Sequence, residues 1–326
     1  MLKKHGFIIA LVGVVILAGL FPGLGARDGM LKAGLLSKLG VMVIFFLQGL
    51  SLKTSELAEG LKDLRLHAFI QGWIFLFAAF FLFPAAVCMR AMGHPDIANG
   101  FLYLILVPTT ISSAVAFSSA AGGNVPAAIF NVTLANLLGV FWVPTGCLLF
   151  FASSGGLSTE LLLPLLGKIA QLILLPLLVG QILRPFVRDS QTLARIQPSF
   201  KVINHSIILF IIFAALAQSF LSKAWDGISP WSLSLLLLLT LIIVLLIHAG
   251  TWWSSGQLGL KHADRVTALF CGSQKTLAAG APMAVAIFAE GSALAGINLG
   301  LLLLPLLCFH PIQLLVAALI LPRLAN

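Results

Sequence analysis

The sequence predicts an all-α polytopic membrane protein with about ten transmembrane helices. Of its 326 residues, 60% are hydrophobic and only 9% are charged, whereas a soluble domain carries about 25% charged residues. The mean hydropathy is +1.09. Apolar runs long enough to cross about 30 Å of hydrocarbon recur along the whole chain. The connections between these runs are short, so we expect no separate soluble domain.

Taken in order, the apolar runs give ten expected spans. They cover residues 6–26, 33–52, 67–90, 98–121, 125–151, 160–184, 202–221, 231–253, 265–289 and 293–321. Spans three to five and eight to ten share an order of features: a long apolar helix, a Gly/Pro-interrupted helix and a further helix. We therefore predict two five-helix repeats, 1–155 and 156–326. Because five is odd, the second repeat is inverted, and inverted repeats place binding sites where their broken helices meet.

The distribution of Lys and Arg predicts the orientation. With the N-terminus inside, twelve of the 19 Lys and Arg residues flank cytoplasmic loops or termini and six flank the other side, Lys275 being the remaining one. Short cytoplasmic loops carry an excess of basic residues. The sequence thus predicts a multi-pass protein of the cytoplasmic (inner) membrane with both termini in the cytoplasm, which requires an even number of spans.

Composition and motifs exclude several functional classes. The net charge of +9 is expected of basic loops beside anionic lipid, so we predict a lipid bilayer and no nucleic acid as partner. No P-loop, Gly-x-Ser-x-Gly or His-Glu-x-x-His pattern occurs, and the four cysteines lack metal-ligand spacing. All ten acidic residues fall in loops or at span ends, so no carboxylate for a proton relay is evident. We therefore expect no enzyme and no cofactor.

Lys275 is the most informative residue, because it interrupts an apolar run. An ammonium near the bilayer centre costs about 2.5–3.5 kcal/mol on insertion scales, so it should face protein or a water-filled cavity. Gly272, Gly280 and Pro282 flank it and indicate a broken helix, which is how transporters build their sites. The candidate binding residues around this break are Ser273, Gln274, Lys275 and Thr276.

Three interpretations of Lys275 stay open. The ammonium could bind an anionic substrate group directly. It could instead occupy the place of a coupling cation and release it by deprotonation, because burial disfavours the charged form of an amine. Alternatively, the side chain snorkels to the membrane interface.

Span four carries a second group of polar residues. Pro108 removes a backbone donor and loosens the helix, and a break is expected near Gly122-Gly-Asn124. The hydroxyls that follow Pro108 are candidate ligands for a cation or for water; they belong to Thr109, Thr110, Ser112 and Ser113. Thr109, Ser112 and Ser113 would share one helix face. The alternative is that these hydroxyls bond to carbonyls of their own helix.

Amide side chains supply the remaining candidates. Asn124 sits in a Gly-Gly-Asn-x-Pro turn and should cap the following helix. Asn131 needs a partner in the middle of span five and has Thr133 as a neighbour, while Asn298 is expected near the meeting point of the broken helices. Interhelical hydrogen bonding is the simpler interpretation of Asn131 and Asn298, as capping is of Asn124.

Three motifs together resemble the bile acid:sodium symporter superfamily. They are Pro108-Thr-Thr-Ile-Ser-Ser, Gly123-Asn-Val-Pro-Ala and Phe270-Cys-Gly-Ser-Gln-Lys-Thr-Leu-Ala-Ala-Gly-Ala-Pro282. The similarity covers nearly the whole chain and is greatest to the bacterial SBF-like branch, which also includes a vertebrate member implicated in calcium handling. The resemblance implies a panel of helices at 6–52 and 160–221 and a core at 67–151 and 231–321. Within this core, helices four and nine would be broken and would cross.

The resemblance also implies possible sodium ligands. Ser113 and Gln274 match ligand positions of the better-known symporters, and Asn131 lies beside the expected span-five ligands. Two positions differ: Ala114 stands where those proteins have Asn, and Phe270 stands where they have a shared Glu. We therefore place a possible sodium at Ser113, Asn131 and Gln274, with Lys275 supplying the positive charge of one missing ion.

The sequence thus predicts a secondary active transporter that moves a small organic anion across the membrane by alternating access. Sodium-coupled symport is the principal expectation. Proton-coupled transport through Lys275, or a non-transporting membrane regulator of ion homeostasis, are the alternatives. The residues leave open the identity of the anion and the oligomeric state.

Overall fold

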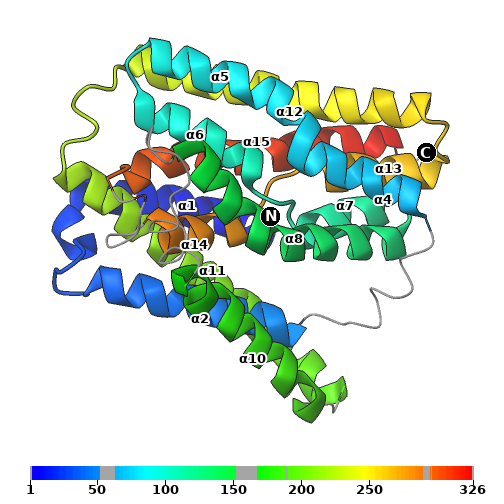
Figure 1. The fold of residues 1–326 in the computed structure, drawn as a ribbon, viewed down its shortest axis with the longest axis horizontal. Helices are drawn as coiled ribbons and strands as arrows, with labels where there is room; N and C mark the ends of the chain where they lie inside the picture. Colours follow the sequence, from blue (N-terminus) through cyan, green and yellow to red (C-terminus); the bar gives the residue numbers. More distant parts are fainter. Residues whose placement is uncertain are drawn as a thin grey trace. The chain divides into compact units, whose positions relative to one another are not determined.

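The fold was analysed in a computed structural model that describes residues 2–51, 63–151, 167–187, 190–288, 294 and 296–324. These residues form helices joined by short connections, and no strand occurs among them (Figure 1). The predicted all-α class is therefore confirmed.

Within the described residues, seven helices are long and apolar enough to cross a membrane. They are Ala33–Ser51, Leu64–Ala91, Val125–Phe151, Gly167–Phe186, Ser199–Leu221, Pro230–Gln257 and Leu299–Leu324. Two further apolar helices, Gly6–Leu20 and Pro95–Leu106, are shorter. Predicted spans four and nine are each divided into two short helices, so neither reaches the length of a continuous span. The total of ten spans and their arrangement as inverted repeats stay predictions.

Residue contacts divide the chain into two compact units, here called unit 1 and unit 2. Unit 1 comprises Met1–Leu52, Pro144–Gly227 and Gly280–Leu303, and unit 2 comprises Lys53–Val143, Ile228–Ala279 and Leu304–Asn326. The predicted boundary between repeats at 155 and 156, and the assignment of panel and core helices, stay predictions.

Unit 1 is built from apolar helices that pack closely. Its elements are α1 (Leu2–Leu20), a 3₁₀ turn (Pro22–Gly25), α2 (Ala33–Ser51), the end of α8, a π turn (Ala170–Leu174), α10 (Leu175–Leu183), a second 3₁₀ turn (Arg184–Val187), α11 (Ser190–Leu221), most of α14 and the start of α15. A Cβ on Gly49 of α2 would collide with the carbonyl of Leu177, and one on Gly180 of α10 would collide with the carbonyl of Phe46. These glycines let the two backbones touch, as small residues do in membrane helix pairs.

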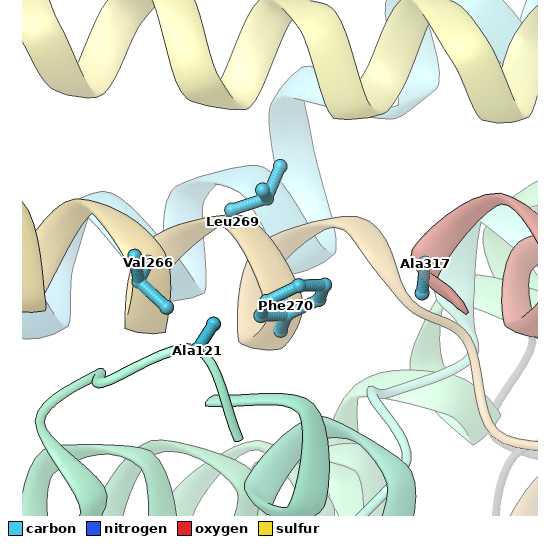
Figure 2. Packing of buried hydrophobic residues seen from close by; sticks show 5 residues of the cluster. All are labelled: Ala121, Val266, Leu269, Phe270 and Ala317. Carbon is cyan, nitrogen blue, oxygen red and sulfur yellow. The ribbon is translucent and has the colours of Figure 1, made fainter. Parts of the chain in front are cut away.

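Unit 2 contains most of the polar residues singled out in the sequence. Its elements are α4 (Leu64–Gly72), a π turn (Trp73–Phe77), α5 (Ala79–Ala91), α6 (Pro95–Leu106), α7 (Ser112–Ala120), most of α8 (Val125–Phe151), α12 (Pro230–Gln257), α13 (His262–Ser273), the first residues of α14 (Leu277–Phe288) and most of α15 (Leu299–Leu324). Figure 2 shows a buried apolar cluster of this unit. It comprises Ala121, Val266, Leu269, Phe270 and Ala317.

Phe270 belongs to this cluster, at the position where the resemblance places a sodium-binding Glu. Its side chain is fully buried and stacks on Phe117 with 5.4 Å between ring centroids. An aromatic ring therefore packs in the core where the better-known symporters would hold a carboxylate.

The first helix break lies between α6 and α7, at residues 107–111. Val107 is extended, with φ −64° and ψ 130°, because a residue before proline is disfavoured in the helical region. No break within span four occurs near Gly122; Gly122 and Asn124 instead form the turn between α7 and α8 that the Gly-Gly-Asn-x-Pro pattern predicted. Gly122 has φ +70° there, which glycine adopts without steric cost.

The second break lies between α13 and α14, at residues 274–276. Gln274 is extended, with φ −95° and ψ 153°. Gly280 and Pro282, which suggested the break, lie inside α14. Gly272 instead serves packing, because a Cβ there would lie 3.1 Å from the Cβ of Trp73. The sequence therefore located the break at Lys275 correctly, but the residues taken as its cause lie elsewhere in regular helix.

Candidate functional site

The ammonium of Lys275 is held by three main-chain carbonyls of unit 2. Its Nζ donates to the carbonyl oxygens of Ile74 at 2.6 Å, Ile105 at 3.0 Å and Val107 at 3.0 Å. The residue is 1% exposed. A lysine ammonium has three donors, so these three contacts use its full capacity.

Interruptions of regular helix explain why these carbonyls are accessible. Ile105 lies in the last turn of α6 and Val107 directly follows it, and the last carbonyls of a helix have no partner within it. Ile74 lies in the π turn Trp73–Phe77, an irregularity that is frequent at functional sites. Lys275 therefore binds where two helices depart from α geometry.

The two breaks are joined directly. The backbone N–H of Thr276 donates to the carbonyl of Pro108 at 2.9 Å, so each break satisfies a main-chain group of the other. Broken helices in membranes are tolerated when their freed backbone groups find partners within the protein. The two breaks and Lys275 thus form one connected polar region inside unit 2.

Gln313 of α15 holds the second break in place. Its Oε1 accepts from the backbone N–H of Lys275 at 2.7 Å, and its Nε2 donates to the Lys275 carbonyl at 2.7 Å. The same Nε2 lies 3.0 Å from Nδ1 of His310. The sequence analysis did not identify Gln313. The signal in the sequence was an amide within an apolar segment, because such a group requires partners when it is buried. Gln313 is fully buried in the structure.

Three oxygen-bearing side chains meet beside the breaks. The hydroxyl of Ser113 lies 2.8 Å from Oε1 of Gln274 and 3.0 Å from Oγ1 of Thr110. These contacts bring Ser113 and Gln274 together, as the sodium assignment required. Gln274 is fully buried, and its Nε2 has no hydrogen-bond partner among the described residues.

Thr109 occupies the break rather than a helix, so it does not share a helix face with Ser112 and Ser113 as expected. Its carbonyl accepts from Nδ2 of Asn136 at 3.0 Å, whereas its buried hydroxyl has no partner within the described part of the chain. Ser112 begins α7 and is exposed. Asn136 is a further residue that the sequence analysis missed.

Asn131 is used by a separate polar group. Its Nδ2 donates to the carbonyl of Ala127 at 2.8 Å and lies 2.9 Å from Nδ1 of His67. Nε2 of Gln71 lies 3.2 Å from Oδ1 of Asn131. Within the described residues, Asn131 thus forms interhelical hydrogen bonds instead of joining Ser113 and Gln274. Thr133, two positions further along α8, is half-buried.

Asn124 has the capping role that the sequence predicted. Its Oδ1 accepts from the backbone N–H of Ala127 at 3.1 Å. Its Nδ2 donates to Asp264 at 2.9 Å, and its carbonyl accepts from the Thr267 hydroxyl at 3.1 Å. These bonds tie the turn before α8 to α13, so Asn124 stabilises the scaffold of the site.

Three remaining candidates have local partners. The hydroxyl of Ser273 donates to the carbonyl of Leu269 at 2.6 Å, four residues earlier in α13. Oγ1 of Thr276 accepts from the backbone N–H of Ala279 at 3.4 Å. Asn298 belongs to unit 1, where its Oδ1 accepts from Leu301 N–H at 3.1 Å and it lines a cavity. Asn298 therefore belongs to a different unit from Lys275.

Known proteins resemble this chain in sequence over nearly its whole length. Residues 5–326 match the model of the SBF-like CPA transporter family. The chain is 33% identical over 329 residues to sodium/bile acid cotransporter 7 of Mus musculus, covering 99% of this chain and 93% of the relative. It is 31% identical over 330 residues to sodium/bile acid cotransporter 7-B of Xenopus laevis, covering 100% and 93%. An uncharacterized protein of Pseudomonas aeruginosa is 31% identical over 321 residues, covering 98% and 92%.

These similarities confirm the predicted family resemblance. They also agree with the expectation that the chain is a multi-pass membrane transporter and no enzyme. The chain belongs to the SBF-like CPA transporter family.

Proposed function

We propose that this transporter moves a small organic anion across the cytoplasmic membrane by alternating access, with sodium as the coupling ion. Both termini would lie in the cytoplasm. The observation that carries the proposal is the polar region of unit 2, where two helix breaks are joined by the Thr276–Pro108 hydrogen bond and hold the buried ammonium of Lys275. Transporter sites are built from such discontinuous helices.

The electrostatics of this region favour an anion. Lys275 places a positive charge in a low-dielectric interior, where its attraction acts more strongly than in water. Because all three of its donors are used by carbonyls, it acts on a substrate through its field and not through direct contact. The N-terminal ends of α7 and α14 follow the breaks, and helix N-termini carry partial positive charge.

Direct contacts to the anion are assigned to the side chains beside the breaks. Nε2 of Gln274 is a buried donor without a partner among the described residues, and the hydroxyl of Thr109 is similarly placed. A buried polar group without a hydrogen bond is costly. Binding of a carboxylate would satisfy these groups and would therefore be favoured.

Lys275 itself takes the place of a cation in this proposal. Transporters bind coupling ions with carbonyls of unwound helices, and here three carbonyls bind an ammonium instead. Phe270 stands where the resemblance expects the Glu that serves two sodium ions. The loss of a negative charge and the gain of a fixed positive one are consistent with one ion site being replaced by Lys275.

One sodium would then bind beside Ser113, Thr110 and Gln274. The Ser113 hydroxyl lies within hydrogen-bonding distance of the Thr110 and Gln274 oxygens, and hard cations take oxygen ligands. The vertebrate relatives are named sodium/bile acid cotransporters, which supports sodium as the coupling ion and an organic anion as the substrate.

Proton coupling through Lys275 is the second candidate. It is favoured by the burial of the ammonium among neutral carbonyls, because burial disfavours the charged form. Release of this proton during transport would free the three carbonyls for a cation.

Thermal unfolding of the detergent-purified protein separates the candidates. The wild type and Lys275→Gln are compared in sodium, potassium and choline chloride at equal ionic strength and at several pH values. A ligand at about 100 times its Kd adds roughly 2.7 kcal/mol of stability, a readily measured shift. A sodium-specific shift of the wild type supports symport. A pH dependence of the wild-type unfolding midpoint that is lost in Lys275→Gln, without a sodium shift, supports proton coupling.

Uptake into proteoliposomes tests transport itself. An imposed sodium gradient should drive uptake of a labelled organic anion in the wild type, and choline should not replace sodium. If no anion or cation stabilises the purified protein and no gradient drives uptake, the transporter proposal is wrong and a regulatory role is favoured.

A further inference from the structure

Unit 1 contains a cavity whose described lining residues all belong to that unit, whereas Lys275 belongs to unit 2. Its volume is about 310 Å³, at the lower end of the range of about 300–1,000 Å³ for small-molecule sites. Parts of α2, α11, α14 and α15 line it, together with the segment that precedes α2. Seven polar residues line the cavity: Arg27, Ser37, Lys38, Gln218, Ser219, Ser222 and Asn298.

The charge of the cavity is positive. Among its described lining residues, the charged ones are Arg27 and Lys38, and both are half-buried. Lys168 lies within electrostatic range of both. Arg27 and Lys38 attract an anion that enters the cavity, and this attraction is stronger at a half-buried position than in bulk water. The planar guanidinium of arginine also matches a carboxylate in geometry.

The polar lining is positioned by close packing. The backbone N–H of Gly34 donates to the carbonyl of Arg27 at 3.1 Å. A Cβ on Gly34 would lie 2.8 Å from Cγ of Arg27, so glycine is what lets the arginine stem lie against the first turn of α2. Asn298 caps α15 through Leu301 and donates to the hydroxyl of Ser222 at 3.1 Å. The cationic and amide groups are therefore held at the cavity wall.

The other walls are apolar. Ile211, Val285 and Phe288 line the same space. A ligand that satisfies both surfaces combines one anionic group with a short hydrocarbon portion.

We propose that this cavity is a binding site for a small organic carboxylate, with Arg27 and Lys38 contacting the carboxylate. The site lies in unit 1, whereas Lys275, Ser113 and Gln274 lie in unit 2, so the inference goes beyond the proposed transport site. If the chain transports an anion as proposed, the cavity provides a second place on the protein where that anion binds.

Binding is tested with butyrate and with butyramide, its uncharged counterpart, by isothermal titration calorimetry on the purified full chain. Butyrate should bind the wild type and butyramide should bind much more weakly. Arg27→Gln and Lys38→Gln should each weaken butyrate binding about tenfold, because each removes a charge-assisted contact. Arg27→Lys should retain more affinity than Arg27→Gln. Lys32→Gln is the matched control, since Lys32 is exposed on the same segment and does not line the cavity.

Sulfonate and phosphonate analogues of butyrate extend the test to other anions. Stronger binding of either would overturn the assignment to carboxylates. Equal binding of butyrate and butyramide, no butyrate binding, or unchanged binding by both Gln variants would overturn the proposed site. The unfolding midpoint of every variant shows whether a loss of binding comes from misfolding. If it does, the charge-retaining variants Arg27→Lys and Lys38→Arg test the site instead. These two variants must still bind butyrate.

The Ser113→Ala variant separates this proposal from the transport proposal. It alters the unit 2 region and should bind butyrate in the unit 1 cavity as the wild type does. Loss of transport with butyrate binding retained would place the fault in the transport site. Transport that persists while no butyrate binds would refute the cavity and leave the transport proposal intact.

Discussion

Positive charges occupy two different surroundings in this protein. In unit 2, the Lys275 ammonium is 1% exposed and donates to three main-chain carbonyls. In unit 1, Arg27 and Lys38 are half-buried and line a cavity of about 310 Å³. Both positions are cationic, but all three donors of Lys275 are used by carbonyls, whereas Arg27 and Lys38 line a cavity. From this comparison we expect that burial and the number of donors already used decide whether a cation stabilises the fold or binds a ligand.

The largest effect on stability is expected from removing the Lys275 ammonium, whose three donors are all used by carbonyls. Lys275→Gln should destabilise the protein by about 3–5 kcal/mol, because the change removes the charged partner from a buried network and leaves carbonyls unpaired. The measurement is the shift of the thermal unfolding midpoint. Lys261→Gln is the matched control, since Lys261 is exposed directly before α13. Equal midpoints for the two variants would show that the carbonyl contacts contribute nothing.

A smaller effect is expected from Gln313→Leu. This change leaves the backbone N–H and carbonyl of Lys275 without their partner and should cost about 1–3 kcal/mol. Hydrogen exchange at the Lys275 amide should become faster as well. Gln257→Leu, at the exposed end of α12, should change neither quantity. Unchanged exchange in Gln313→Leu would mean that the break is held by other contacts.

Ser113→Ala should cost about 1 kcal/mol, since it removes the hydrogen bond to Gln274. Its more informative consequence concerns sodium. If Ser113 is a ligand, the sodium-specific shift of the unfolding midpoint should shrink or vanish. Ser112→Ala alters an exposed neighbouring hydroxyl and should retain that shift, so the same sodium response in both variants would contradict the assignment.

The smallest effect on stability is expected at the cavity. Lys38→Gln should change stability by no more than about 0.5 kcal/mol, because it removes a half-buried charge at a ligand-accessible wall. If Lys38→Gln lost as much stability as Lys275→Gln in the same unfolding experiment, the expected difference between the two sites would be wrong. Lys38 would then be a structural cation like Lys275.

Much of the architecture was predictable from local sequence. Apolar runs located the helices, because a membrane-spanning segment must satisfy its own backbone within a helix. Pro108 indicated a weakened helix, and Lys275 marked a polar place in an apolar run. Asn124 was correctly expected to cap α8, since Gly-Gly-Asn-x-Pro is a local turn signal.

Other features could not be derived from local patterns. The expected break near Gly122 was a turn, whereas the actual break follows α6 at 107–111. Asn131, proposed as a sodium ligand, bonds with His67 and its own helix. Several amides in apolar helices look alike in the sequence, and only their three-dimensional neighbours distinguish a ligand from a packing residue.

The sequence by itself determined that the chain is an all-helical membrane protein with a lysine at an interrupted helix, because hydropathy and helix breaking act over a few neighbouring residues. Tertiary structure alone decided that the ammonium reaches the carbonyls of Ile74, Ile105 and Val107 and that Gln313 pairs with the backbone of Lys275. It also placed Asn298 in a different unit from Lys275. These partners are distant along the chain, so packing, and no local pattern, selects which buried groups meet.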